Sequence, residues 1–282
     1  MKPLLNRKNS FLLLLRFFFL FLGKVSKVSI ENRDEEGFFM WQAAMWGGIS
    51  GSAVLLGALA AVFLPIGKKI IGYIMAFGTG VLIGASTYEL LGDSVHNGGL
   101  KATSLGFLAG AVVFTFLDYL ISRQGANKRK RSTKQMAASS SGIAIFIGTV
   151  MDAIPESIMI GASLIENATV SWLLVIAIFI SNIPEGLSST TGLVKSGFSK
   201  KKIFLLWAAV LFISAFSSWT GFVFLDHASE TLMAAIAAFA GGGIIAMVGS
   251  TMMPEAYEEG GSITGLIAAL GLLASLILDH FS

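Results

Sequence analysis

Apolar segments long enough to cross a membrane follow one another along most of the chain. A helix needs about 20 predominantly apolar residues to span the hydrocarbon core of a bilayer. Segments of this kind lie at roughly 46–65, 69–92, 100–122, 141–165, 171–194, 202–225, 230–253 and 262–281. Strands are not expected, because an open sheet leaves backbone groups unpaired in lipid and these segments are too long for barrel strands. The pattern therefore predicts an all-α membrane protein with eight transmembrane helices.

Composition supports a membrane protein and narrows its chemistry. Hydrophobic residues make up 54% of the chain and charged residues only 13%, which is far from the averages of soluble domains. The chain has no cysteine, so disulfides, thiolate metal ligands and cysteine nucleophiles are excluded. The net charge of +3 comes from residues between the apolar segments, and no nucleic-acid partner is expected. The lipid bilayer is the partner that the composition indicates.

Lys and Arg gather in alternate turns, which sets the predicted orientation. The turns after the first, third and fifth segments are basic, whereas those after the second, fourth and sixth contain only Lys101. The basic turns are expected in the cytoplasm. The basic residues are Lys68, Lys69, Arg123, Lys128, Arg129, Lys130, Arg131, Lys134, Lys195, Lys200, Lys201 and Lys202. We therefore expect a multi-pass protein of the plasma membrane, with both termini on the non-cytoplasmic side and a cytoplasmic linker at about 123–140.

Residues 1–39 do not fit this scheme. The stretch "FLLLLRFFFLFLG" is short for a membrane span and contains Arg16. It is compatible with a signal-peptide core, with an upstream extension that does not belong to the membrane domain, or with a ninth helix. We therefore divide the chain into an N-terminal extension or targeting segment, 1–39, and an eight-helix membrane domain, 40–282.

Acidic residues interrupt two successive apolar segments in nearly the same way. "TVMDAIPESIMIGAS" holds Asp152 and Glu156, and "FISNIPEGLSSTTG" holds Ser181 and Glu185. Each pair is four residues apart, so its members share one helical face. A carboxylate near the bilayer centre costs about 2.5–3.5 kcal/mol on insertion scales, and such residues normally face a partner or a water-filled cavity. The repeated pattern indicates a functional site.

A proline stands directly before the glutamate in both segments. Pro155 frees the backbone carbonyl of Met151, and Pro184 frees that of Ile180. Carboxyl groups that face one another repel, and a bound cation or bound protons relieve the repulsion. A single such segment is explained by a structural bend with a protonated acid. Two in succession favour a cation pathway between two kinked helices.

The two motifs carry a family resemblance. "DAIPES" and "SNIPEG", in the fourth and fifth of eight predicted spans, resemble the signature of the Zrt/Irt-like (ZIP) metal transporters, typically His-Asn-x-Pro-Glu-Gly. The resemblance covers about residues 44–281 and includes "MMPEAYEEG" at the end of the seventh span. It implies a 3+2+3 arrangement with inverted repeats. It also implies that spans one, four, five and six move against spans two, three, seven and eight, which often form a homodimer.

The resemblance also implies a set of metal ligands. These are Asp152, Glu156, Ser181, Asn182 and Glu185. Asp152 replaces the usual first His, and Ser181 stands where a second His or a Gln is common. The family's neighbouring second site would use positions that here hold Ala153, Asn182 and Ser218, so two of its three ligands are missing. The resemblance thus implies one metal site and not a binuclear centre.

The predicted function is transport of a divalent metal cation, zinc, manganese or iron, toward the cytoplasm. Zinc prefers nitrogen and sulfur ligands, while oxygen ligands suit manganese better. The ion is the substrate, and no cofactor is predicted. Enzymatic activity is not expected, because the chain lacks Gly-x-Gly-Asp, His-Glu-x-x-His and Gly-x-Ser-x-Gly patterns. The alternative is a membrane sensor of the same fold that binds metal without transporting it.

Two further features lie in the second and seventh spans. "GVLIGASTYE" and "GIIAMVGSTMMPE" are loosely alike and are predicted to run in opposite orientations. Acidic residues stand at the ends of these spans, on opposite sides of the membrane: Glu89, Asp93, Glu255, Glu258 and Glu259. They either attract cations to each mouth or are simply solvated helix ends.

The ligand pattern generates a first prediction. Replacing Asp152 with His supplies the nitrogen ligand that zinc prefers, so Asp152→His is expected to shift selectivity toward zinc relative to manganese. The measurement is the ratio of zinc to manganese uptake in proteoliposomes. An unchanged ratio with normal expression would mean that position 152 does not contact the ion.

Overall fold

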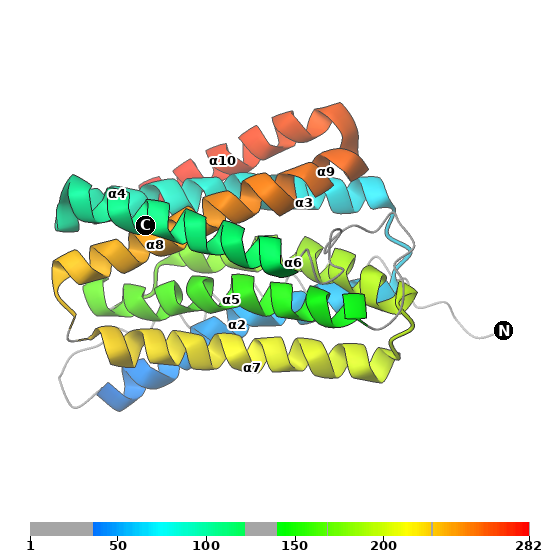
Figure 1. Cartoon of the computed structure of the whole chain (residues 1–282), viewed down its shortest axis with the longest axis horizontal. Helices are drawn as coiled ribbons and strands as arrows, with labels where there is room; N and C mark the ends of the chain where they lie inside the picture. Colours follow the sequence, from blue (N-terminus) through cyan, green and yellow to red (C-terminus); the bar gives the residue numbers. More distant parts are fainter. Residues whose placement is uncertain (1–35, 122–139, 168, 227, 282) are drawn as a thin grey trace. The chain divides into compact units, whose positions relative to one another are not determined.

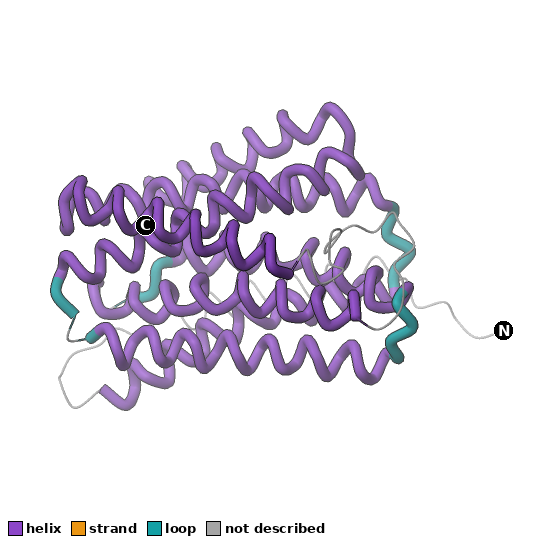
Figure 2. Tube along the Cα trace, in the orientation of Figure 1, coloured by secondary structure: helices purple, strands orange, loops and turns teal. Residues whose placement is uncertain are grey.

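The described residues fold into helices, and most of the described connections between them are short turns. The computed structural model describes residues 36–121, 140–167, 169–226 and 228–281 (Figure 1). No strand occurs among these residues (Figure 2). Six helices are long and apolar enough to cross a membrane. The predicted all-α class is therefore confirmed for the described part of the chain, and the helices are those expected of an integral membrane protein.

The helices follow the predicted apolar segments closely. In chain order they are α2 (Glu36–Phe63), α3 (Lys68–Ala85), the π-helix η2 (Ser86–Gly92), α4 (Asp93–Ile121), α5 (Ser140–Asn167), α6 (Trp172–Lys195), α7 (Lys200–Leu225), α8 (Glu230–Met247), the π-helix η4 (Val248–Met252), α9 (Met253–Gly260), the 3₁₀ turn η5 (Gly261–Ile263) and α10 (Thr264–Phe281). The first helix begins at Glu36, earlier than predicted and inside the segment assigned to the N-terminal extension. The rest of that extension and nearly all of the predicted linker at 123–140 lie outside the described residues.

Two of the six long helices are much longer than a bilayer is thick. Lys68–Ile121 contains 54 residues and Glu230–Phe281 contains 52. Gly99 (φ 76°, ψ 162°) breaks the first run and Gly261 (φ 75°, ψ −159°) breaks the second, in conformations that only glycine adopts readily. Figure 1 shows the chain reversing direction at both places. The turn expected at about 93–99 is therefore confined to Gly99, because the polar residues before it continue the helix.

Serine residues are the N-caps of three helices. Ser171, Ser199 and Ser229 each precede the first residue of a helix and accept a hydrogen bond from a backbone N–H three residues later. Such N-caps satisfy donors that would otherwise lack a partner at the helix end. They fix where α6, α7 and α8 start.

Small residues allow the helices to pack with their backbones in contact. The main pairs are α4 with α8, α3 with α10 and α5 with α7. A Cβ added at Gly110 would overlap the Phe239 carbonyl oxygen on α8, and one at Gly161 would overlap the Ser218 carbonyl oxygen on α7. Seams of small residues are the usual contact between helices in membranes. The close approach of these helix pairs thus depends on small residues where they cross.

Helix α6 is the most enclosed of the long helices. In its most apolar stretch 83% of the residues are buried, more than in any other of the six. A Cβ at Gly57 of α2 would overlap the Ile183 carbonyl oxygen of α6, and one at Gly186 of α6 would overlap the Val54 carbonyl oxygen of α2. Helix α3 also packs against α6. Polar side chains on α6 are therefore shielded by neighbouring helices.

The glycine seams generate a second prediction. A Cβ at Gly271 of α10 would press on the backbone of Phe77 and Val81 in α3, whereas one at Gly265 of the same helix meets nothing within 4 Å. Gly271→Ala is expected to lower the free energy of unfolding by about 1–3 kcal/mol, the usual cost of overpacking. Gly265→Ala is the matched control and should leave stability unchanged or slightly higher. Thermal unfolding of the purified proteins in detergent measures both, and equal melting temperatures would contradict the close contact between α3 and α10.

Candidate metal centre

The predicted ligands lie on two adjacent helices and all of them are buried. Helix α5 contains Pro155 and helix α6 contains Pro184, each inside the helix as expected. The exposed fractions are 4% for Asp152, 2% for Glu156, 2% for Ser181, 4% for Asn182 and 3% for Glu185. These polar side chains are therefore enclosed by protein and do not face lipid. Burial of this kind is expected of functional carboxylates in a membrane-spanning segment.

A hydrogen bond joins the two helices at Glu185. The hydroxyl of Thr149 on α5 donates to Glu185 Oε1 on α6 at 3.0 Å, and Thr149 itself is buried. Thr149 precedes Asp152 by three residues and Glu156 by seven, so all three lie on one face of α5. The Glu185 carboxylate thus approaches the face of α5 that carries the two other acids. Thr149 was not predicted as a site residue, although its helical spacing from Asp152 is visible in the sequence.

Ser181 and Asn182 make their polar contacts in other directions. The Ser181 hydroxyl donates to the Ile178 carbonyl of its own helix at 3.0 Å. The Asn182 amide donates to the Ser50 carbonyl of α2 at 3.4 Å. The structure therefore places these two predicted ligands beside the α5–α6 contact without showing them in it.

The carbonyl freed by the second proline lies toward α3. A Cβ added at Gly78 of α3 would lie 3.5 Å from the Ile180 carbonyl oxygen and 3.1 Å from Ser181 Cα. Within the described residues, no three side chains of His, Cys, Asp or Glu are grouped so that they could hold a metal ion. The structure thus brings α5 and α6 together at Glu185 but does not gather three acidic ligands around one point.

The second metal site of the family that the motifs resemble would use positions 153, 182 and 218, and none of these positions holds a carboxylate. Ala153 packs in an apolar cluster with Trp207 and Val210 of α7. Ser218 is fully buried and lies against Gly47 of α2, and its hydroxyl oxygen has no hydrogen-bond partner among the described residues. This side of α5 is used for packing against α7.

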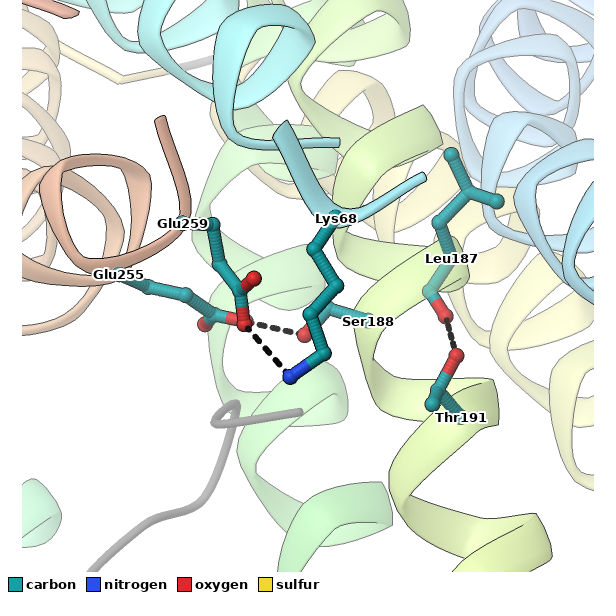
Figure 3. Close-up of polar contacts among 6 residues, drawn as sticks. All are labelled: Lys68, Leu187, Ser188, Thr191, Glu255 and Glu259. Atoms are coloured by element: carbon teal, nitrogen blue, oxygen red, sulfur yellow. Dashed lines mark hydrogen bonds and ion pairs between the residues drawn. The ribbon is translucent and has the colours of Figure 1, made fainter. Parts of the chain in front are cut away.

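A second polar cluster lies at the end of α6 that carries Ser188 (Figure 3). The Ser188 hydroxyl donates to Glu255 Oε1 of α9, and Glu255 is only 3% exposed. Nearby, Lys68 Nζ lies 3.8 Å from Glu259 Oε1. Glu255 is therefore buried and bonded, so the interpretation of this residue as a solvated helix end is wrong. The sequence analysis missed Ser188 as its partner.

A pocket lies at the other end of α6. It is bounded by residues of η2, α4, α5, α6 and α8, including Glu89, Asp93, Asn97, Met159, Ser163 and Met233. Glu89 Oε1 accepts a hydrogen bond from the Ser171 hydroxyl at 2.7 Å. Acidic and amide side chains therefore line part of a hollow at this end, together with apolar residues.

The bond between α5 and α6 generates a third prediction. Thr149→Val keeps the shape of the side chain but leaves the buried Glu185 without this donor, and a hydrogen bond to a charged group contributes about 1.5–3 kcal/mol. We expect Thr149→Val to lower the melting temperature in detergent. Thr149→Ser is the control, because it keeps the hydroxyl, and it should retain most of the stability. A loss of stability in Thr149→Ser that is absent in Thr149→Val would show that packing of the Thr149 methyl group, and not the bond to Glu185, is what matters.

Comparison with models of protein families and with curated proteins gives no match for this chain. Among the described residues, the feature that most clearly indicates a function is the burial of acidic side chains on two proline-containing helices, α5 and α6.

Proposed function

We propose that the protein transports a divalent metal cation across the membrane toward the cytoplasm. The observation that carries the proposal is the burial of Asp152, Glu156 and Glu185, each less than 5% exposed, in two helices that are apolar enough to span a bilayer. Burying a carboxylate in a membrane-spanning segment costs free energy, and such residues normally mark an ion or proton pathway. The likeness of "DAIPES" and "SNIPEG" to the ZIP signature supports the same function.

The proposed arrangement has eight membrane crossings. A continuous helix of 54 residues would be about 81 Å long, far more than the roughly 30 Å hydrocarbon core. The breaks at Gly99 and Gly261 support two crossings for each long run. Helices α5 and α6 would then form the central pair of a 3+2+3 arrangement with inverted repeats.

Acidic residues mark a path along α6. Glu89 and Asp93 line the pocket at one end, Glu185 lies along the helix, and Glu255 lies at the other end. Lys68 lies beside Glu259 at this second end, and by the positive-inside rule it marks the cytoplasmic side. The proposed direction is from the pocket at Glu89 toward the basic side, in the plasma membrane, with both termini outside.

The candidate ligand atoms are oxygens, which favour an ion that prefers oxygen ligands. The candidate ligands are carboxylate, hydroxyl and amide groups, which suit manganese or ferrous iron, while the ZIP resemblance favours zinc. Because the described structure does not gather three acidic ligands, ion binding would have to draw α5 and α6 closer at Asp152 and Glu156. From the resemblance we also propose that two sets of helices move against each other. The moving set is α2, α5, α6 and α7. The other set, α3, α4, α8 and α10, would form a homodimer.

The central glutamates generate a fourth prediction. Glu156→Gln and Glu185→Gln preserve size but remove a charged ligand, and metal binding depends on deprotonated oxygen ligands. Each variant is expected to lose at least nine-tenths of metal uptake in proteoliposomes, while thermal stability is kept or rises because a costly buried charge is removed. Glu230→Gln, at an exposed residue of α8, is the matched control and should transport normally.

Three outcomes separate the alternatives. Wild-type uptake by both Gln variants would contradict a metal site at this pair. Failure of both variants to fold would favour a structural role for the two acids. Binding of metal by the unmodified protein, without uptake under any ion gradient, would favour a membrane sensor over a transporter.

A further inference from the structure

Two π-helical segments occur at related positions in the fold. η2 (STYELLG) extends α3 and η4 (VGSTM) extends α8, and they overlap the loosely similar stretches "GASTYE" and "VGSTMMPE". Thr87 in η2 donates to the carbonyl four residues earlier at 2.7 Å, and Thr251 in η4 does the same at 2.8 Å. π-helical turns are uncommon and frequently mark functional sites. Each of these turns contains or precedes a glutamate that reaches α6.

The first of these glutamates holds the start of α6. Glu89, within η2, accepts a hydrogen bond from the Ser171 hydroxyl at 2.7 Å. Ser171 is the N-cap of α6, and its backbone N–H donates to Ser163 of α5 at 3.0 Å. We call the Glu89–Ser171 bond the outer latch.

The second glutamate holds the other end of the same helix. Glu255 follows η4 by three residues and accepts a hydrogen bond from the Ser188 hydroxyl of α6 (Figure 3). Both side chains are almost fully buried, with exposed fractions of 1% for Ser188 and 3% for Glu255. We call the Glu255–Ser188 bond the inner latch.

The two latches lie at opposite ends of the predicted span. At 1.5 Å per residue, Ser171 and Ser188 are about 26 Å apart along α6, close to the thickness of the hydrocarbon core. Glu185 lies one turn from Ser188. Both bonds therefore connect α6, the helix that carries Glu185, to residues within a π-helical turn (Glu89) or shortly after one (Glu255), one bond near each predicted side of the membrane.

We infer that the two latches are the contacts that open in turn when α6 moves, so that breaking one favours the state that is open on that side. This inference rests on the proposed transport function, because only a transporter needs the two ends of α6 to open alternately. A hydrogen bond to a carboxylate shifts a two-state equilibrium by roughly tenfold or more. Loss of one latch should therefore expose its own end of α6 and close the other.

The absence of cysteine from the chain makes a direct test simple. Ala162→Cys places a reporter thiol at the outer pocket, and Ser189→Cys places one beside the inner latch. Each is introduced alone into the full chain in lipid nanodiscs, where both faces are open to reagent. The rate of labelling by a membrane-impermeant maleimide is then measured.

Each latch is removed by deleting the serine hydroxyl from α6. Ser188→Ala should raise labelling at position 189 about tenfold and lower it at position 162. Ser171→Gly, which keeps most of the capping ability of that position, should do the reverse. Thr191→Val is the matched control, because the Thr191 hydroxyl donates to the Leu187 carbonyl of its own helix and should leave both rates unchanged (Figure 3). Ser188→Thr keeps the hydroxyl and should label like the parent, which separates loss of the bond from disturbed folding.

The outcomes distinguish the latches from the transport function, because labelling requires no metal. Opposite changes at the two reporters support the latches even when no ion is taken up, and in that case it is the transport proposal that fails. Changes in the same direction, or changes equal to those of Thr191→Val, would overturn the latches whether or not the protein transports metal.

Discussion

The burial of carboxylates inside membrane-spanning helices is the constraint on which the rest of the structure depends. Asp152, Glu156 and Glu185 have to be shielded from lipid, and each has to be stabilised by neighbours within the protein. The fold meets this need by enclosing α6 between α2, α3 and α5 and by supplying the Thr149 hydroxyl to Glu185. The same acids that make folding costly are those that suit a cation, so the stability and the proposed function of this region are opposed.

Close packing is what allows α6 to be enclosed. Glycine at the crossings lets backbones touch, as at Gly57 and Gly186 between α2 and α6. Because such contacts depend on small residues, a larger side chain at either position would push the two helices apart. Hydrogen bonds from Ser171 and Ser188 add specific contacts between α6 and its neighbours.

Hydropathy predicted most of the fold because the bilayer sets the length of every span. It spread the turn between the second and third spans over about 93–99, whereas the structure confines this turn to Gly99 within α4, because Asp93 and the polar residues after it continue the helix until Gly99 changes the backbone direction. The burial of Glu156 and Glu185 was predictable from the repeated motifs. The bond between Ser188 and Glu255 was not, because it joins residues far apart in sequence and depends on how α9 packs. The π-helical turns could not be predicted either. A π-helical hydrogen bond joins residues five apart instead of four, and this difference does not change the hydropathy of the sequence.

The most direct measurement is X-ray absorption spectroscopy of the purified protein loaded with zinc or manganese. The chain has no cysteine and no histidine in α5 or α6, so a cation held by Asp152, Glu156 and Glu185 must have only oxygen neighbours. We expect a first shell of oxygen atoms that is lost when Glu156 and Glu185 are both replaced by Gln. Imidazole scattering, or binding that survives the double replacement, would contradict a cation site between α5 and α6.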